Sequence, residues 1–180
     1  MDLVERAKVF ARAAHAAVGQ VRKYNGEPYV NHCEEVARIL VENSAGPVSP
    51  EQIAAAWLHD TVEDTKVTLE LINQEFGLVV GVYVENLTDV SRPGDGNRKV
   101  RKQLDLEHTA RAQPEAKSVK LADLISNARN IVEFDPDFAR VFLHEKVRLL
   151  EVLGDGDPGL LALAHETVAE ARTKLAGSSR

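Results

Sequence analysis

Two histidines and two aspartates in this chain are of residue types that could hold a metal ion together. His59 and Asp60 are adjacent within a run of small apolar residues, His32 precedes them, and Asp123 follows much later. Imidazole nitrogens and carboxylate oxygens form a mixed donor set that suits Mn²⁺, Fe²⁺ or Zn²⁺. Four protein ligands leave coordination positions for water and phosphate oxygens, which metal-assisted hydrolysis requires.

The His59-Asp60 pair is weak evidence when taken alone. Adjacent residues of an α-helix point about 100° apart, so both can reach one point only near a helix end or a kink. The alternative is a histidine satisfied within the core and an aspartate at a helix end. Asp123 changes this balance because it lies in the mostly apolar run VKLADLI, where an unpaired carboxylate would be costly to bury.

Further polar residues are spaced one helical turn after these candidates. Glu63 and Asp64 share a helical face with His59 and Asp60 if the helix continues, and Asn127 is related to Asp123 in the same way. A carboxylate beside a metal can orient a water molecule or take its proton. The alternatives are a solvated acidic helix end for the two acids and a surface polar residue for Asn127.

The charge distribution bears on the kind of ligand. The chain has a net charge of −6, so it has no general attraction to nucleic acids or anionic membranes. An anionic ligand therefore needs a local basic patch, and residues 92–103 supply one against a single acid, Asp95. Its cations are Arg92, Arg98, Lys99, Arg101 and Lys102. A solvated basic helix face is the alternative for any one of them.

The elements that must position these residues are predicted to be helices. The apolar residues are mostly Ala, Leu and Val, and aromatic residues make up only 5% of the chain, which favours helix over sheet. Ser49-Pro50 followed by Gln52 is a strong helix start with a capping box. Thr68 is a weaker start because Leu71 stands where that box needs Glu or Gln.

Apolar periodicity and breakers then give the predicted order. Helices are expected over residues 2–18, 34–43, from 50 through the AAAWLHD segment, 68–76, 78–88, 98–112, 115–131, 137–153 and 158–175. The predicted fold class is all-α, with nine or ten helices and at most one short β-hairpin. A single domain is expected over residues 1–176, followed by a frayed tail at 177–180.

Three segments together resemble the HD superfamily, and most closely the hydrolase domains of Rel/SpoT proteins and the single-domain small alarmone hydrolases. They are RKYNGEPYVNH (22–32), AAWLHDTVEDT (55–65) and VKLADLISNARN (119–130). The likeness extends over most of residues 5–153. It implies an HD-domain helical bundle and a Mn²⁺-dependent removal of the 3′-pyrophosphate from (p)ppGpp or a closely related alarmone.

The resemblance also implies roles for individual residues. It makes His32, His59, Asp60 and Asp123 the metal ligands, Glu63 and Asp64 the water-activating acids, and it puts Asn127 against the substrate. Arg22 and Lys23 match a basic pair beside the base and ribose, and Asn130 falls where the family can touch the base edge. Because the pyrophosphate is highly anionic, we assign Arg98, Arg101 and Lys102 to substrate binding as well.

The chain departs from the family pattern at several positions. Cys33 replaces a usual Pro, Leu124 a usual Arg or Lys, and Ser126 a usual aromatic residue or His; where many relatives place a Tyr, this chain offers Val141, Phe142 and His144. These departures do not affect the predicted metal ligands, but they leave the identity of the substrate undetermined. ppApp, NADPH and other 3′-phosphorylated nucleotides are alternatives. A non-catalytic nucleotide-binding module would predict loss of the ligands or of Glu63-Asp64, and all of these are present.

The remaining sequence features concern location and partners. The N-terminal segment lacks the apolar stretch of a signal peptide, no apolar run is long enough to span a bilayer, and the single cysteine, Cys33, permits no internal disulfide. We therefore expect a cytoplasmic protein with a nucleotide partner. A homodimer is compatible with the sequence. Tyr29 is expected to serve mainly in packing.

Overall fold

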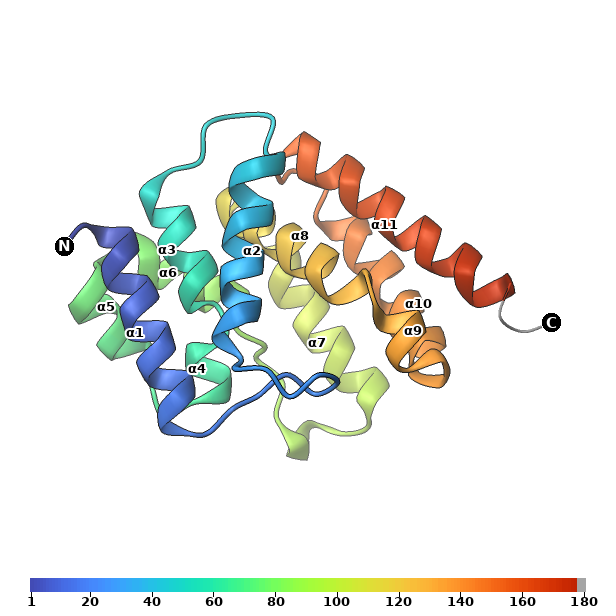
Figure 1. The fold of residues 1–180 in the computed structure, drawn as a ribbon, viewed down its shortest axis with the longest axis horizontal. Helices are drawn as coiled ribbons and strands as arrows, with labels where there is room; N and C mark the ends of the chain where they lie inside the picture. The colour runs from blue at the N-terminus through green and yellow to red at the C-terminus, as the bar shows by residue number, and fades with distance from the viewer. Residues whose placement is uncertain (178–180) are drawn as a thin grey trace.

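The computed structural model describes residues 1–177, which form helices joined by loops and turns (Figure 1). The helices are α1 (Leu3–Ala17), α2 (Val30–Asn43), α3 (Pro50–Leu58), α4 (Thr61–Asp64), α5 (Leu69–Phe76), α6 (Leu78–Leu87), a 3₁₀ turn η1 (Pro93–Asp95), α7 (Arg98–Ala110), α8 (Pro114–Ala128), α9 (Ile131–Phe134), α10 (Pro136–Val152) and α11 (Pro158–Gly177). Over the described residues the only β-pairing is an isolated antiparallel bridge between Val21 and Pro28. The all-α prediction is confirmed. Without the single-turn helices α4 and α9, the helix count falls within the predicted range.

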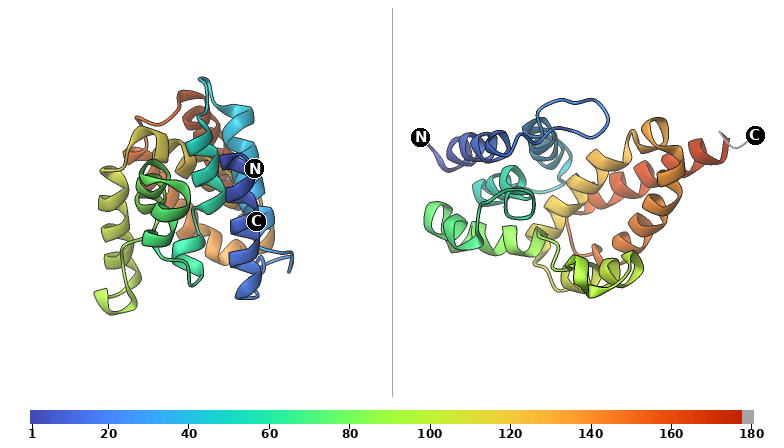
Figure 2. Two further views of the ribbon diagram at one scale, coloured as in Figure 1. Left: turned by 90° about the vertical axis from the view of Figure 1, so that its left-hand side faces the viewer. Right: turned by 90° about the horizontal axis from the view of Figure 1, so that it is seen from below.

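Helices α2 and α8 form the centre of the molecule. Figure 1 shows α2 between α3 on one side and α8 on the other, and both pairs are in contact. Helices α1 and α11 lie toward opposite ends of the long axis, as the view from below in Figure 2 also shows. The two central helices therefore have neighbours on both sides, and polar groups on their facing surfaces are shielded from water.

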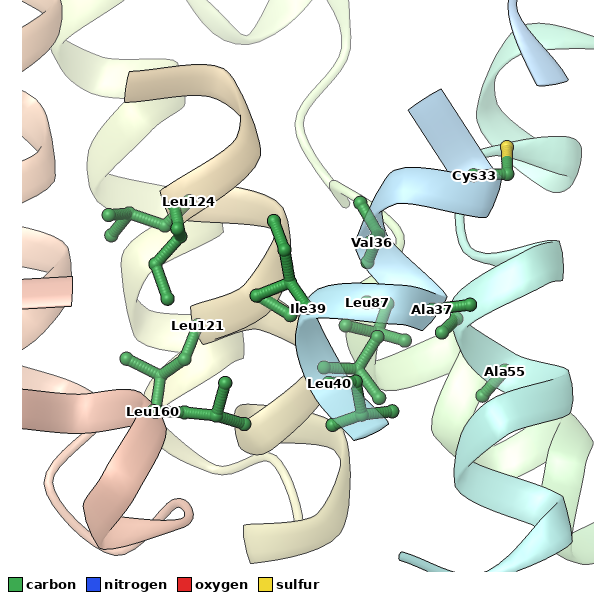
Figure 3. Close-up of a cluster of buried hydrophobic side chains, with 14 of the residues drawn as sticks. Cys33, Val36, Ala37, Ile39, Leu40, Ala55, Leu87, Leu121, Leu124 and Leu160 are labelled. Carbon is green, nitrogen blue, oxygen red and sulfur yellow. The ribbon is translucent and has the colours of Figure 1, made fainter. Parts of the chain in front are cut away.

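The apolar core fills the space between these helices. Figure 3 shows α2 side chains facing α8 and α3, with further contributions from α6 and α11. The labelled members of this cluster are Cys33, Val36, Ala37, Ile39, Leu40, Ala55, Leu87, Leu121, Leu124 and Leu160. Leu124 is fully buried here. The departure from a basic residue at this position therefore adds a core side chain, not a contact for the ligand.

The predicted helix starts at Ser49 and Thr68 are confirmed in atomic detail. The Gln52 amide N–H donates to Ser49 Oγ at 3.1 Å, and the Ser49 N–H donates to Gln52 Oε1 at 3.0 Å. Thr68 Oγ1 accepts the Leu71 N–H at 3.2 Å. Both caps satisfy N–H groups that have no partner inside the helix.

Two predicted boundaries differ from the structure by three residues or more. Helix α2 begins at Val30 instead of Glu34, because Tyr29 already has helical dihedral angles and the polar Asn31 and His32 hide the periodicity of the first turn. Helix α8 ends at Ala128, three residues early, because Asn130 leaves the helical region at φ −119° and ψ 4°.

The C-terminal prediction can be followed only in part. Gly177 is the last residue of α11, and the rest of the predicted tail, residues 178–180, lies outside the described residues. None of the described helices combines the length and the apolar character needed to cross a membrane.

Candidate metal centre and active site

The His59-Asp60 pair lies at a break between two helices. Helix α3 ends at Leu58 and α4 begins at Thr61, so His59 is the C-cap of one helix and Asp60 the N-cap of the next. This break is the geometry that the pair needs in order to face one point. His59 Nε2 and Asp60 Oδ2 lie 2.9 Å apart. It also means that Glu63 and Asp64 belong to α4 and do not continue the face of α3.

The other two candidates come from the two central helices and meet the pair. His32, in the first turn of α2, places Nε2 at 3.1 Å from Asp123 Oδ1 of α8 and at 3.8 Å from Asp60 Oδ2. His59 Nε2 lies 3.8 Å from Asp123 Oδ1. Donor atoms of His32, His59 and Asp123 all lie within 4.8 Å of one another. The structure therefore brings all four predicted ligands together.

The donor atoms fit a divalent metal ion. The imidazoles of His32 and His59 are buried to 0% and 1% exposure. His59 Nδ1 lies 2.8 Å from the Ala56 carbonyl oxygen, which can only accept, so the Nδ1 proton is used there. His59 Nε2 is buried, and despite its short distance to Asp60 it has no hydrogen-bond partner in the described part of the chain. A buried nitrogen that faces two carboxylates without a hydrogen bond is suited to coordination.

The electrostatics of the centre favour a bound cation. Burial opposes ionisation of Asp123, yet the hydrogen bond from His32 and the charge of Lys120 bring its pKa well below the usual value. Burial also opposes protonation of His59, but Asp60 and Asp123 raise the pKa of His59 to about 9. The carboxylates are thus ionised at neutral pH, and a proton competes with a metal ion for the imidazole.

Two neighbours form hydrogen bonds with the carboxylates of the candidate ligands Asp60 and Asp123. Tyr29 Oη donates to Asp60 Oδ2 at 2.7 Å, and Asn127 Nδ2 donates to Asp123 Oδ1 at 2.6 Å. Tyr29 packs against the core, as predicted, but the contact of its hydroxyl with Asp60 was not predicted. The Tyr29 hydroxyl reaches Asp60 because α2 begins directly after Tyr29. The sequence pattern did not reveal this early start of the helix.

The two acids of α4 have separate anchors. Glu63 Oε2 accepts the backbone N–H of Asp89 at 3.2 Å. Although Glu63 is an exposed residue, the protein atoms around its carboxyl group and the nearby Asp89 raise its pKa to about 7. Asp64 Oδ2 accepts a hydrogen bond from Gln20 Nε2 at 2.8 Å. Gln20 was not predicted, since it stands in a polar connection with no periodic signal.

A cleft of about 510 Å³ opens beside His32 and Asn127. Arg22, Lys23 and Asn130, all predicted to contact substrate, line it. Aromatic residues line it as well, namely Tyr24, Tyr29, Phe134, Phe138 and Phe142. The rings of Tyr24 and Phe134 stack at 5.4 Å with an interplanar angle of 3°. Such a mixture of flat apolar faces and cations suits a nucleotide.

A smaller cavity of about 230 Å³ shares Phe138 and Phe142 with this cleft. Its cationic lining residues are Arg98, Lys102, Lys120, Lys146 and Arg148. Arg98 makes two 2.7 Å contacts with the carboxylate of Glu145, and Lys102 pairs with Asp89 at 2.6 Å. Arg101 lines neither cavity, and its Nε is buried without a hydrogen-bond partner among residues 1–177.

Three of these cations, Lys120, Lys146 and Arg148, were not predicted from the sequence. Lys120 is placed so that Asp123, Asp89, Asp60 and Glu63 overcome its burial and raise its pKa. Lys146 lies over the Phe142 ring at 4.9 Å, and it makes no ion pair with any residue of the described chain. Lys120 could have been found from the KLAD motif, whereas α10 gave no signal for Lys146.

Comparisons with known proteins agree with this geometry. The HD domain family matches residues 7–149. A Xenopus tropicalis protein named guanosine-3′,5′-bis(diphosphate) 3′-pyrophosphohydrolase MESH1 is 39% identical over 137 residues, which cover 75% of this chain and 73% of the relative. The human protein of that name is 41% identical over 112 residues, covering 62% of this chain and 60% of the relative. A probable GTP pyrophosphokinase of Mycobacterium leprae is 36% identical, and the match spans 76% of this chain but only 17% of that protein.

A solved structure is similar over nearly the whole chain. It is described by the words "A metazoan ortholog of SpoT hydrolyzes ppGpp and plays a role in starvation responses". The superposition has a TM-score of 0.82 at 27% identity and covers 94% of this chain and 96% of that one. Since a family match over most of the chain coincides with the convergence of its histidines and aspartates, the chain belongs to the HD domain family.

Proposed function

We propose that this protein is a Mn²⁺-dependent hydrolase that removes the 3′-pyrophosphate from (p)ppGpp or a closely related alarmone, giving GDP or GTP and pyrophosphate. The observation that carries this proposal is the meeting of His32, His59, Asp60 and Asp123 at one point beside the aromatic and basic cleft. The activities named for the relatives and for the similar structure support the choice of substrate.

We assign the metal to these four side chains, which come from α2, α8 and the break between α3 and α4. Two imidazoles favour a transition metal ion such as Mn²⁺ over Mg²⁺. When bound, the divalent ion polarises a phosphoryl oxygen and makes a water molecule more acidic. Tyr29 and Asn127 keep Asp60 and Asp123 oriented through the hydrogen bonds described above.

The acids of α4 provide the proton chemistry in this proposal. A carboxylate with a pKa of about 7, such as Glu63, is well matched to accept a proton from water at neutral pH. Asp64, anchored by Gln20, stands beside it as the second acid. Water attacks the phosphorus attached to the ribose 3′-oxygen, the 3′-oxygen leaves and takes up a proton, and pyrophosphate is released.

The two cavities divide the substrate between them. We place the nucleoside in the larger cleft, with its base among the aromatic rings near Arg22, Lys23 and Asn130 and with Asn127 facing the reacting end. We place the pyrophosphate toward the smaller cavity. Arg98 and Lys102 are partly neutralised there by Glu145 and Asp89, so Lys120 and Lys146 supply much of the remaining positive charge. Arg101 would need to rearrange to reach the substrate.

We further propose that residues 1–176 act as one hydrolase unit in the cytoplasm. The free, buried Cys33 is compatible with a reducing compartment. The net charge of −6 disfavours nucleic acids and anionic membranes as partners. A homodimer is compatible with this function, and sedimentation measurements would test for it.

An assay of the purified protein with a panel of nucleotides tests the function. The panel contains ppGpp, pppGpp, ppApp and NADPH, with Mn²⁺ or Mg²⁺ supplied and the products separated by chromatography. We expect GDP or GTP and pyrophosphate from the guanine alarmones, faster with Mn²⁺ and abolished by a chelator. Full activity in excess chelator would refute the metal requirement. Faster turnover of NADPH or ppApp would move the substrate assignment to those nucleotides.

A further inference from the structure

The metal ligand His32 is supported on its far side by two residues that the proposed function does not use. Its Nε2 faces Asp123 and Asp60, while its Nδ1 lies 3.0 Å from Ser126 Oγ. A histidine that offers Nε2 to an ion must carry its proton on Nδ1, and that proton needs an acceptor. Ser126 is 4% exposed and lies in the wall of the larger cleft.

The direction of the hydrogen bonds follows from the next contact. Ser126 Oγ donates to Glu35 Oε2 at 2.8 Å. The single hydroxyl proton is therefore used toward Glu35, which leaves a lone pair of Oγ for the Nδ1 proton of His32. The second oxygen of Glu35 lies 3.8 Å from Arg129 Nη1, so a cation stands beside this carboxylate.

The hydrogen bond between Ser126 and Glu35 also joins α8 to α2. Glu35 follows His32 by three residues on α2, and Ser126 follows Asp123 by three residues on α8. The two ligand-bearing helices are thus joined by side chains one turn away from the ligands themselves. His59 has no such need, because its Nδ1 is held by the backbone carbonyl of Ala56.

We propose that Ser126 and Glu35 are positioning residues that hold His32 in the Nδ1–H form and aim its Nε2 at the metal ion. This inference rests on the metal centre of the proposed function and assigns a role to the departure from the family pattern at Ser126. Residues that orient a metal-ligating histidine typically contribute about 10- to 100-fold to metal affinity. Ser126→Ala should therefore weaken Mn²⁺ binding by that factor.

The control for this variant lies on the same helix. Ser118 is also 4% exposed, and its hydroxyl donates to the Pro114 carbonyl oxygen and accepts the Asp157 N–H, both at 2.9 Å. Ser118→Ala should lose comparable hydrogen bonding and leave Mn²⁺ affinity unchanged. Ser126→Thr keeps the hydroxyl and should restore affinity. Glu35→Gln still offers an acceptor oxygen, so its effect should be smaller than that of Ser126→Ala.

The test measures Mn²⁺ affinity by calorimetry without nucleotide for the wild type and the four variants. We expect a loss of affinity in Ser126→Ala, recovery in Ser126→Thr and wild-type affinity in Ser118→Ala. Wild-type affinity in Ser126→Ala would overturn the proposal, and so would an equal loss of affinity in Ser118→Ala. Because this measurement does not involve hydrolysis, an enzyme that spares every alarmone would refute the proposed function and leave this inference standing.

Discussion

At the scale of single residues, Glu63 meets two demands that oppose each other. A general base at neutral pH needs a pKa near 7, and the surroundings of Glu63 raise its pKa to about that value. The same surroundings disfavour the ionised form that the reaction uses. Active sites commonly combine perturbed titration with a cost in stability. Glu63→Gln tests both the catalytic role and the stability cost, because glutamine keeps the size of the side chain and never ionises.

The first expected result concerns turnover. Glu63→Gln should fold, hold its metal and bind nucleotide, while kcat falls by roughly the 10²–10⁴-fold typical of a lost general base. The smaller end of that range is expected if Asp64 takes over part of the role. His59→Ala should instead lose metal and activity together. Elemental analysis, calorimetry and kcat on the same preparations distinguish these outcomes, and a near-normal kcat for Glu63→Gln would remove Glu63 from the mechanism.

The second expected result concerns stability against pH in the metal-free protein. The pKa of Glu63 rises from a reference value of 4.5 to about 7 on folding. Between these values the folded protein retains a proton on Glu63 that the unfolded chain releases. The contribution of protonated Glu63 to the free energy of unfolding is therefore complete below pH 4.5 and is lost as the pH rises through 7. The melting temperature of Glu63→Gln relative to wild type should therefore increase from pH 5 to pH 8. Glu70→Gln, at an exposed glutamate of α5, is the control, and parallel pH profiles for wild type and Glu63→Gln would contradict this account.

At the scale of elements, the site depends on where helices stop and start. His59 and Asp60 reach one point because α3 ends and α4 begins between them. The sequence allowed this break to be anticipated, since a bridging pair of adjacent residues requires it. The capping box at Ser49 and the four candidate ligand residues, which the structure brings together, could also be predicted, because these signals are local or carried by motifs.

Contacts between distant segments could not be predicted in this way. The pairing of Arg98 with Glu145 neutralises a predicted phosphate contact, and the link from His32 through Ser126 to Glu35 crosses between α2 and α8. Both depend on how helices are rotated about their axes. The periodicity of one helix says which face is apolar, but not which polar residue of another helix will oppose it.

An expected result at this scale tests the start of α3. Ser49→Ala removes the acceptor for the Gln52 N–H and should lower the free energy of unfolding by about 1 kcal/mol. Mn²⁺ affinity should remain, because His59 lies at the other end of the helix. Urea unfolding of the metal-free protein measures the change. Thr173→Ala, at an exposed threonine bonded only within its own helix, is the comparison, and equal midpoints for the two variants would argue against a stabilising cap.

At the scale of the whole molecule, the proposed metal centre joins parts of the chain that are far apart in sequence. Its proposed ligands come from the first turn of α2, from the break after α3 and from the middle of α8. The same helices carry the apolar core in Figure 3. An ion held by these side chains can bind tightly only when the core is assembled. Metal binding should therefore act on global stability and not on one segment.

The size of this effect follows from linkage. An ion that binds only the folded state stabilises it by about 2.7 kcal/mol when the free ion is at 100 times its Kd. For a domain of this size that corresponds to a rise in melting temperature of roughly 5–10 °C. Thermal unfolding in a chelator and in increasing Mn²⁺ should show this rise, with Mg²⁺ giving less because the donor set contains two imidazoles. Asp123→Asn keeps the shape of the ligand but removes its charge, and its melting temperature should respond little to Mn²⁺. A wild-type protein whose melting temperature ignores Mn²⁺, or an Asp123→Asn variant that responds as fully as the wild type, would show that the four side chains do not form the metal site.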